Sequence, residues 1–167
     1  MEHESGSEQF SLRRAEMANA PILARHRCEM FKDMGELRVN AYRALEEAST
    51  AYFATAIVSG EYLSWVVTPA REPQRIVAGG GVQLRMRLPR PDRYGNLEKS
   101  GPEALVLNVY TEQAWRRKGI AEMLMRTILD WSLENGVASL VLHASEMGRP
   151  LYERLGFTSG NEMYYPL

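Results

Sequence analysis

The most informative segment of this chain is the basic turn Arg116-Arg117-Lys118-Gly119-Ile120-Ala121. It lies between an apolar run at residues 104–110 and an amphipathic segment that starts at Ile120. The first N–H groups of a helix have no intrahelical acceptor, and the helix dipole places partial positive charge there. Gly119 lets the backbone approach an anion closely, and the small Ala121 keeps the next turn clear. The turn therefore indicates a phosphate site; the alternative is an ordinary basic loop.

The segments around this turn alternate between strand and helix. Residues 105–110 predict a central strand buried on both faces. Apolar residues from Ile120 to Trp131 recur at helical spacing, and Asn135-Gly136 ends that helix. Residues 138–143 predict the next strand, which should pair in parallel with the first because a helix joins them. Residues 149–155 predict a short helix and residues 163–167 a terminal strand.

The first half of the chain predicts two helices and three strands. Residues 10–14 alternate as a strand does, and a helix should start at Asn19-Ala20-Pro21 and end near Gly35. A second helix is expected over residues 36–57. Two antiparallel strands follow, at residues 62–67 and from residue 75 toward residue 88, with a turn at residues 68–73. The run Gly79-Gly80-Gly81 favours a bulge or close backbone contact inside the second of these strands over a nucleotide loop.

A second motif, Leu151-Tyr152-Glu153-Arg154-Leu155-Gly156-Phe157, begins thirty residues after Ala121. With the pattern Arg-x-x-Gly-x-Ala of the basic turn, it makes the chain resemble the GCN5-related N-acetyltransferase (GNAT) superfamily. The acyl-CoA pyrophosphate loop of that superfamily reads Arg/Gln-x-x-Gly-x-Gly/Ala, and a later segment often reads Tyr-Glu-x-Leu-Gly-Phe. The close resemblance runs from Leu105 to the C-terminus. Upstream, Arg27-x-x-Met30-Phe31-x-Asp33-Met34-Gly35 resembles a segment of some bacterial members.

The resemblance implies an α/β fold of the mixed α+β kind. A central, mostly antiparallel sheet would be flanked by helices, and its fourth and fifth strands, at residues 105–110 and 138–143, would be parallel and splay apart. Residues 9–167 would form a single acetyltransferase domain after a flexible tail at residues 1–8. Residues 88–102 predict a long surface loop, which either overhangs the substrate cleft or is disordered.

The resemblance also implies acetyl-CoA as the acyl donor and no metal. The pantetheine arm would lie between the splayed strands, where the backbone of Leu107 and Val109 would meet its amides and the thioester carbonyl. The pyrophosphate would bind the N–H groups from Arg117 through Lys118, Gly119 and Ile120 to Ala121. Either Arg116 or Arg117 would add charge-assisted hydrogen bonds.

Tyr152 is the candidate general acid. Attack of an amine on the thioester expels a thiolate, and a desolvated phenol with a pKa near ~10 can protonate it. In the family, the tyrosine before Glu-x-Leu-Gly-Phe often has this role. The alternative is an amphipathic tyrosine that packs under the cofactor.

The attacking amine must also lose a proton, and several residues are candidates for the base. His143 lies at the end of the predicted strand at residues 138–143, where the cleft should open. Glu146-Met147-Gly148-Arg149 departs from relatives that carry an asparagine between this strand and the last helix, so the usual polar contact there is in doubt. The other candidates are a chain of water molecules and the carboxylates Glu29, Asp33, Glu36 and Glu162.

Composition limits the classes of partner. The 167 residues are 45% hydrophobic with a net charge of −1 and a pI near 6.3, so no global basic field attracts nucleic acid or an anionic membrane. The acidic start lacks the features of a signal peptide, and no apolar run approaches the ~20 residues that span a bilayer. The single cysteine, Cys28, predicts a buried apolar side chain and fits a reducing cytoplasm.

The resemblance implies an acetyl-CoA-dependent N-acetyltransferase. It would act by direct transfer in a ternary complex on a primary amine of a small molecule or protein. The alternative is a non-catalytic acyl-CoA-binding or regulatory module. Apolar and aromatic residues at the C-terminus also favour a homodimer with an edge formed by Met163, Tyr164, Tyr165 and Leu167.

Overall fold

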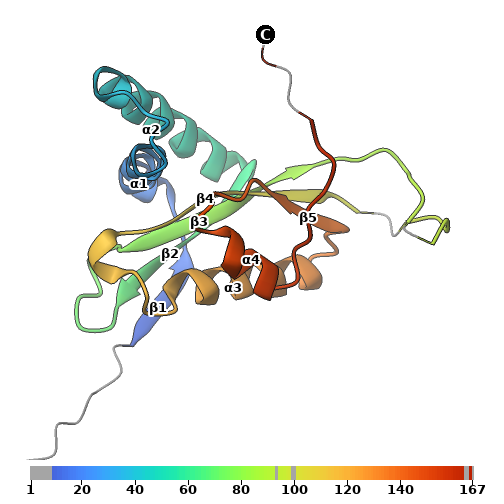
Figure 1. Ribbon diagram of the computed structural model, residues 1–167. Coiled ribbons are helices and arrows are strands. Elements are labelled where there is room, and N and C mark those ends of the chain that lie inside the picture. Colours follow the sequence, from blue (N-terminus) through green and yellow to red (C-terminus); the bar gives the residue numbers. More distant parts are fainter. Residues whose placement is uncertain (1–8, 93, 99–100, 164–165, 167) are drawn as a thin grey trace, which may run out of the picture.

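A central sheet organises the fold. The computed structural model describes residues 9–92, 94–98, 101–163 and 166, and within them five strands pair in the order β1-β2-β3-β4-β5 (Figure 1). The pairs from β1 to β4 are antiparallel, whereas β4 and β5 are parallel, as the sequence predicts. The strands are β1 (Phe10–Arg14), β2 (Tyr62–Pro69), β3 (Ala78–Arg85), β4 (Glu103–Thr111) and β5 (Ser139–Leu142).

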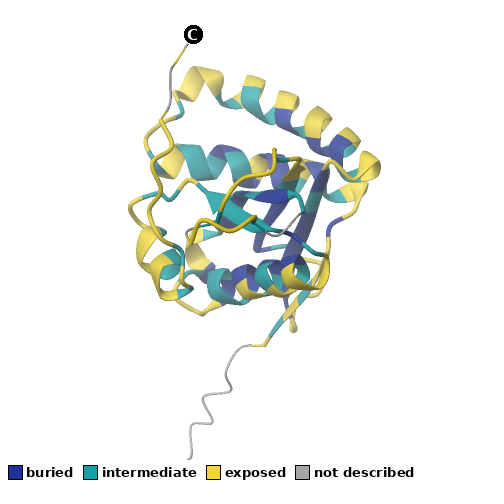
Figure 2. Cartoon of the chain, turned by 90° about the vertical axis from the view of Figure 1, so that its right-hand side faces the viewer, coloured by how far each residue is buried: buried dark blue, intermediate teal, exposed yellow. Residues whose placement is uncertain are grey.

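Helices cover both faces of the sheet. Figure 1 shows α1 (Ala20–Asp33) and α2 (Tyr42–Ser59) on one face, and α3 (Ile120–Glu134) and α4 (Arg149–Arg154) on the other. The helix α3 joins the parallel strands β4 and β5, as the predicted crossover requires. The strands are the most buried layer between the helices (Figure 2). Among the described helices, none is long and apolar enough to cross a membrane.

The helix boundaries follow the local signals with one exception. Pro21 lies in the first turn of α1, where its missing N–H costs nothing, and Gly35 follows the helix with a φ of 73°. The second helix begins at Tyr42 rather than at residue 36. The left-handed Gly35 reverses the chain, Arg38 is extended, and a short 3-10 turn (Val39–Ala41) comes before the helix. Residues 36–41 therefore form the connection between α1 and α2.

Two predicted strands differ from the structure. The strand expected from residue 75 begins at Ala78 and ends at Arg85, because the preceding turn occupies more of the chain. Residues 157–163, which include the start of the predicted terminal strand, are neither helix nor strand. Tyr164, Tyr165 and Leu167 of the predicted dimer edge lie outside the described residues, as does the tail at residues 1–8. The described part of residues 88–102 is a loop with an isolated bridge between Pro91 and Leu97.

The hydrophobic core has a layer on each side of the sheet. Between the sheet and α1 and α2, Leu23 packs with Phe53 and Tyr62. On the other side, Leu124 and Ile128 of α3 pack against β-strand residues that include Val82 and Val106. Cys28 is fully buried, in agreement with its predicted role as an apolar side chain.

The glycine run in β3 allows close packing, as predicted. The pairing of β3 with β4 shifts register between Gly79 and Gly81. A Cβ atom at Gly81 would lie 2.7 Å from Cζ of Tyr62 and 2.8 Å from its hydroxyl oxygen, and it would also overlap the carbonyl oxygen of Leu63. Gly81 is therefore required because the Leu63 carbonyl and the Tyr62 ring occupy the space that a Cβ atom would take.

We predict that Gly81→Ala lowers the free energy of unfolding by at least about 2 kcal/mol, because the added methyl group meets rigid backbone as well as the Tyr62 ring. Urea unfolding measures the loss. Gly160→Ala is the matched control, since a Cβ atom there has no neighbour within 4 Å among the described residues. Equal stability of the two variants would contradict this account of the packing.

Candidate functional site

The parallel strands β4 and β5 separate part of the way along β4. Their pairing starts at Glu103 and Ser139 and ends at Val106 and Leu142, but β4 continues to Thr111. Within the described part of the chain, no strand pairs with residues 107–111 on the β5 side. This unpaired stretch beside residues 107–111, called the opening below, lies where the resemblance implies that the fourth and fifth strands splay apart.

A bulge in β4 lies at the start of this opening. Leu107 is opposite Gly81 and Tyr110 is opposite Gly79, so Asn108 and Val109 together face a single residue of β3. Asn108 has a φ of 60°, a left-handed conformation that asparagine tolerates better than most residues. Its side-chain Nδ2 donates a hydrogen bond of 3.2 Å to the carbonyl oxygen of Leu23 in α1.

The bulge changes which face of the sheet each residue of β4 meets. Leu107 packs with the cluster under α1 and α2, and Asn108 also bonds to α1, so two consecutive residues point to the same side. Val109 packs with the cluster under α3. The prediction that residues 105–110 are buried on both faces is therefore only partly correct. Leu105, Leu107 and Val109 are half-buried; for Leu107 and Val109 the reason is that β4 continues beyond its last pair with β5.

The predicted phosphate turn joins the end of β4 to α3. Arg117 and Gly119 have left-handed φ values of 64° and 78°, and Gly119 is the residue that caps the helix. The first helical hydrogen bond runs from the N–H of Met123 to the Gly119 carbonyl at 3.0 Å. The N–H groups of the three residues between them have no intrahelical acceptor, so the turn has the backbone donors of an anion site. A Cβ atom at Gly119 would have no neighbour within 4 Å among the described residues, so φ is what requires glycine here.

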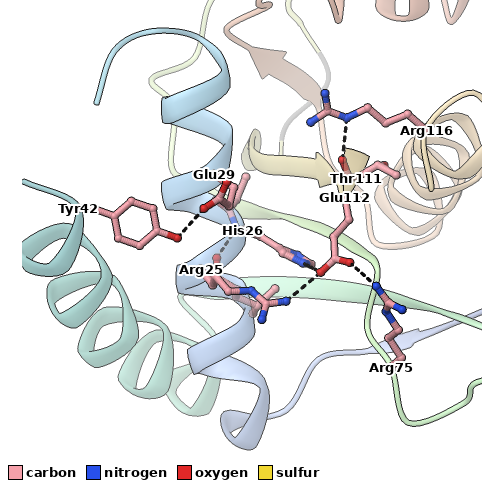
Figure 3. Close-up of polar contacts among 10 residues, drawn as sticks. Arg25, His26, Glu29, Tyr42, Arg75, Thr111, Glu112 and Arg116 are labelled. Atoms are coloured by element: carbon pink, nitrogen blue, oxygen red, sulfur yellow. Dashed lines mark hydrogen bonds and ion pairs between the residues drawn. The ribbon is translucent and has the colours of Figure 1, made fainter. Parts of the chain in front are cut away.

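The two arginines of the turn have different environments. Arg116 points back into the protein: its Nε donates to the Thr111 carbonyl at 2.9 Å, and its Nη2 forms an ion pair with Asp33 of α1. Figure 3 shows this Arg116 side chain with its bond to Thr111. The guanidinium also lies 5.4 Å from the centre of the Tyr110 ring. Arg117, in contrast, is exposed, so it is the arginine available to a bound anion.

Tyr152 lies on α4 and packs against the cluster under α3. Its ring meets Phe157 edge-on with a centroid separation of 6.0 Å, and a Cβ atom at Gly148 would lie 2.9 Å from its Cε2. Burial raises the pKa of Tyr152 above its usual value of 10.0, so the phenol is protonated at neutral pH. The residue therefore has the protonation state that a general acid needs.

The candidate bases lie at the surface or are already paired. His143 follows the end of β5, is 72% exposed, and has its Nε2 3.9 Å from Oε1 of Glu162. Glu29 accepts hydrogen bonds from the Tyr42 hydroxyl at 2.8 Å and from Lys32 at 3.2 Å. Asp33 is bound to Arg116. Glu36 is exposed. Among the described residues, no cluster of histidine, cysteine, aspartate and glutamate is arranged to hold a metal ion.

A polar cluster around Glu112 was not predicted from the sequence. One carboxylate oxygen of Glu112 lies 2.8 Å from Arg25 and 3.3 Å from Nε2 of His26, and the other lies 3.4 Å from Arg75 (Figure 3). His26 is 1% exposed, and burial lowers its pKa although Glu112 opposes the change. The signal available in the sequence was a carboxylate directly after a strand. Members of the cluster line a cavity of about 340 Å³, formed by Arg25, His26, Glu29, Lys32, Asp33, Tyr110, Glu112 and Gln113.

Solved structures share this architecture. A GCN5-related N-acetyltransferase from Ralstonia eutropha JMP134 matches with a TM-score of 0.82 and 27% identity, over 95% of this chain and 99% of that one. A predicted acetyltransferase with acetyl-CoA from Clostridium acetobutylicum matches with a TM-score of 0.76 and 24% identity, over 95% and 96%. An aminoglycoside N-acetyltransferase in complex with CoA has a TM-score of 0.69 and 11% identity, over 98% and 97%.

A search of curated proteins found no significant match. Comparison with family profiles, in contrast, agrees with the structural comparison. The sequence profile of the acetyltransferase (GNAT) family matches residues 29–157, which include the end of α1, the opening beside β4, the phosphate turn and Tyr152. The chain belongs to the acetyltransferase (GNAT) family.

Proposed function

We propose that this protein transfers an acetyl group from acetyl-CoA to a primary amine of a small molecule or a protein. The observation that carries the proposal is the path of β4. The strand leaves β5 after Val106 and leads through Thr111 to the phosphate turn before α3. An unpaired strand edge next to an anion site suits a ligand with a peptide-like arm and a pyrophosphate, and acyl-CoA has both.

In this proposal the cofactor binds mainly to the backbone. The pantetheine amides add to the free edge of β4 around Val109, as an extra strand would. The pyrophosphate accepts hydrogen bonds from the N–H groups between Arg117 and Ala121. Arg117 supplies the additional charge, since Arg116 is engaged by Asp33 and Thr111. The solved neighbour with acetyl-CoA supports the choice of donor.

The reaction is a direct acyl transfer in a ternary complex. The neutral amine attacks the thioester carbonyl and forms a C–N bond, and the C–S bond then breaks to release the CoA thiolate. Tyr152 donates its phenolic proton to the departing sulfur and is reprotonated from solvent. The products are an acetylated amine and CoA with a free thiol.

The attacking amine loses its proton to His143 in this mechanism. The imidazole lies at the end of β5, at the point where the strands separate, and it is exposed to solvent. Its Nε2 lies 3.9 Å from Oε1 of Glu162. An exposed base can pass its proton directly to water, so it is restored after each turnover.

Thiol release separates this function from that of an acyl-CoA-binding module. The protein is mixed with acetyl-CoA and a panel of primary amines, and free CoA is followed with a thiol reagent. We expect release that depends on the amine and an acetylated product identified by mass spectrometry. Tight binding of acetyl-CoA without release for any amine of the panel would favour the binding module.

We predict that Gly119→Gln weakens acetyl-CoA binding several-fold and that Gly119→Glu weakens it roughly tenfold further, because the second variant adds negative charge beside the pyrophosphate. The two side chains have almost the same volume and meet the same φ of 78°, so their comparison isolates charge. Calorimetry at two salt concentrations measures the affinities. The higher salt concentration should reduce the difference in affinity between the two variants, because salt screens the added charge. Wild-type affinity in both folded variants would show that the turn does not bind the pyrophosphate.

We predict that Tyr152→Phe reduces turnover by roughly 10²-fold and leaves acetyl-CoA affinity nearly unchanged, because the ring still packs against Phe157 but the proton donor is lost. Single-turnover kinetics and calorimetry measure the two effects separately. If chemistry limits the rate and turnover is unchanged, the residue only packs. If affinity falls together with turnover, it positions the cofactor.

A further inference from the structure

We propose that Tyr62 is a positioning residue for the transfer step. Its hydroxyl holds the carbonyl group of Leu107 and thereby aims the N–H group of Asn108 at the thioester carbonyl. The inference rests on the proposed function, because it assigns the donor that polarises the acyl group in that reaction. It adds a residue of β2, a strand that does not border the opening.

The Tyr62 side chain reaches β4 from two strands away. Tyr62 pairs with Gln83 of β3, and its hydroxyl donates a hydrogen bond of 3.3 Å to the Leu107 carbonyl oxygen. The side chain can cross β3 because Gly81 has no Cβ atom in its path. Tyr62 is 1% exposed, and burial raises its pKa, so the hydroxyl keeps the proton that it donates.

Because the peptide unit is planar, fixing the Leu107 carbonyl also fixes the direction of the Asn108 N–H group. In a trans peptide the C=O group and the following N–H group point in opposite directions, and the described residues contain no cis peptide bond. The strands β2 and β3 lie on one side of β4, and β5 lies on the other. Because Tyr62 holds the Leu107 carbonyl on the β3 side, the Asn108 N–H points to the side from which β5 has departed.

A second contact fixes the other end of the same unit. Asn108 is held at a φ of 60° by the hydrogen bond from its Nδ2 to the Leu23 carbonyl oxygen. Next to it, the Ser64 hydroxyl donates to the Gly80 carbonyl at 3.0 Å and anchors the facing residue of β3. The peptide unit after Leu107 is thus fixed at its carbonyl by Tyr62 and at its following residue by Asn108.

The hydroxyl of Tyr62 is not explained by packing alone. A phenylalanine would fill the same space over Gly81 and would pack equally well with Leu23 and Phe53. The hydroxyl gives the Leu107 carbonyl a hydrogen bond next to the bulge, where the register of β3 and β4 shifts, and a buried carbonyl without a partner is costly. At this position the same bond also orients a backbone donor, and preorganised donors are among the largest contributions to acyl-transfer catalysis.

The test compares Tyr62→Phe with Tyr52→Phe as the matched control. Tyr52 is a half-exposed tyrosine on α2, and its hydroxyl contacts Gln83 and Glu61. We expect kcat of Tyr62→Phe to fall between about 10-fold and 100-fold, the range for a misplaced reacting group. Its KM for the amine and its Kd for CoA should stay within about twofold of wild type. The control should leave all three values unchanged.

An infrared measurement reports the polarisation directly. Acetyl-CoA labelled with ¹³C at the thioester carbonyl is bound in the absence of amine, and the carbonyl stretch is compared with that of the free cofactor. We expect binding to lower the frequency in wild type and in Tyr52→Phe, and to lower it less in Tyr62→Phe. Bound and free cofactor absorb at separate frequencies, so a partly folded sample lowers the intensity of the bound band and does not change its position.

The outcomes distinguish the inference from the proposed function. If wild type transfers acetyl groups but Tyr62→Phe keeps both full kcat and the full carbonyl shift, Tyr62 is only a packing residue and the function stands. If kcat falls while the carbonyl shift is unchanged, Tyr62 does not aim the donor and the inference is wrong. If wild type does not bind acetyl-CoA, the proposed function and this inference both fail.

Discussion

The loss of strand pairing after Val106 is the constraint on which the site depends. Backbone N–H and C=O groups need partners, and a sheet normally supplies them along the full length of a central strand. Here β4 runs five residues past its last pair with β5. Among the described residues, β4 is unpaired there on the β5 side alone, because β3 pairs with its other side along almost its whole length. A ligand with amide groups can form the missing ladder hydrogen bonds with β4. The cost in free energy is low, because the strand is already held in place by β3.

The bulge at Asn108 illustrates how the fold compensates for an unfavourable backbone conformation. A non-glycine residue with positive φ costs of the order of 1 kcal/mol. The Nδ2 bond to Leu23 and the Tyr62 bond to the preceding carbonyl offset this cost from two directions. The side-chain Oδ1 of Asn108 remains buried without a partner among the described residues. Such a strained, partly satisfied position is typical of a functional site rather than of a structural core.

Electrostatics at this site is local. The chain has a net charge of −1, so long-range attraction of an anionic cofactor is weak. The helix terminus and the exposed Arg117 concentrate positive potential at one turn instead. The ion pair between Arg116 and Asp33 ties this turn to the end of α1. The cluster around Glu112 makes a second link, because it joins α1 to the chain just after β4.

The order of elements and the position of the phosphate turn were determined by the sequence itself. Helical spacing after Ile120, the stop at Asn135-Gly136 and the Arg-x-x-Gly-x-Ala pattern are local signals, and the structure confirms the elements that they predict. Local signals also identified the glycine run as a close contact. They were less reliable at residues 36–41 and at the start of β3, where the length of a connection depends on what it must span.

The tertiary structure alone decided the directions of side chains and the partners of polar groups. Arg116 and Arg117 are neighbours of the same type, but only contact with Asp33, 83 positions earlier, shows which of them points inward. The bond from Tyr62 to Leu107 joins residues 45 positions apart and requires a glycine on the strand between them. Such contacts depend on register and on the order of strands in the sheet. A pattern of neighbouring residues in the sequence contains no information on register or strand order, because both arise only when distant segments pack together.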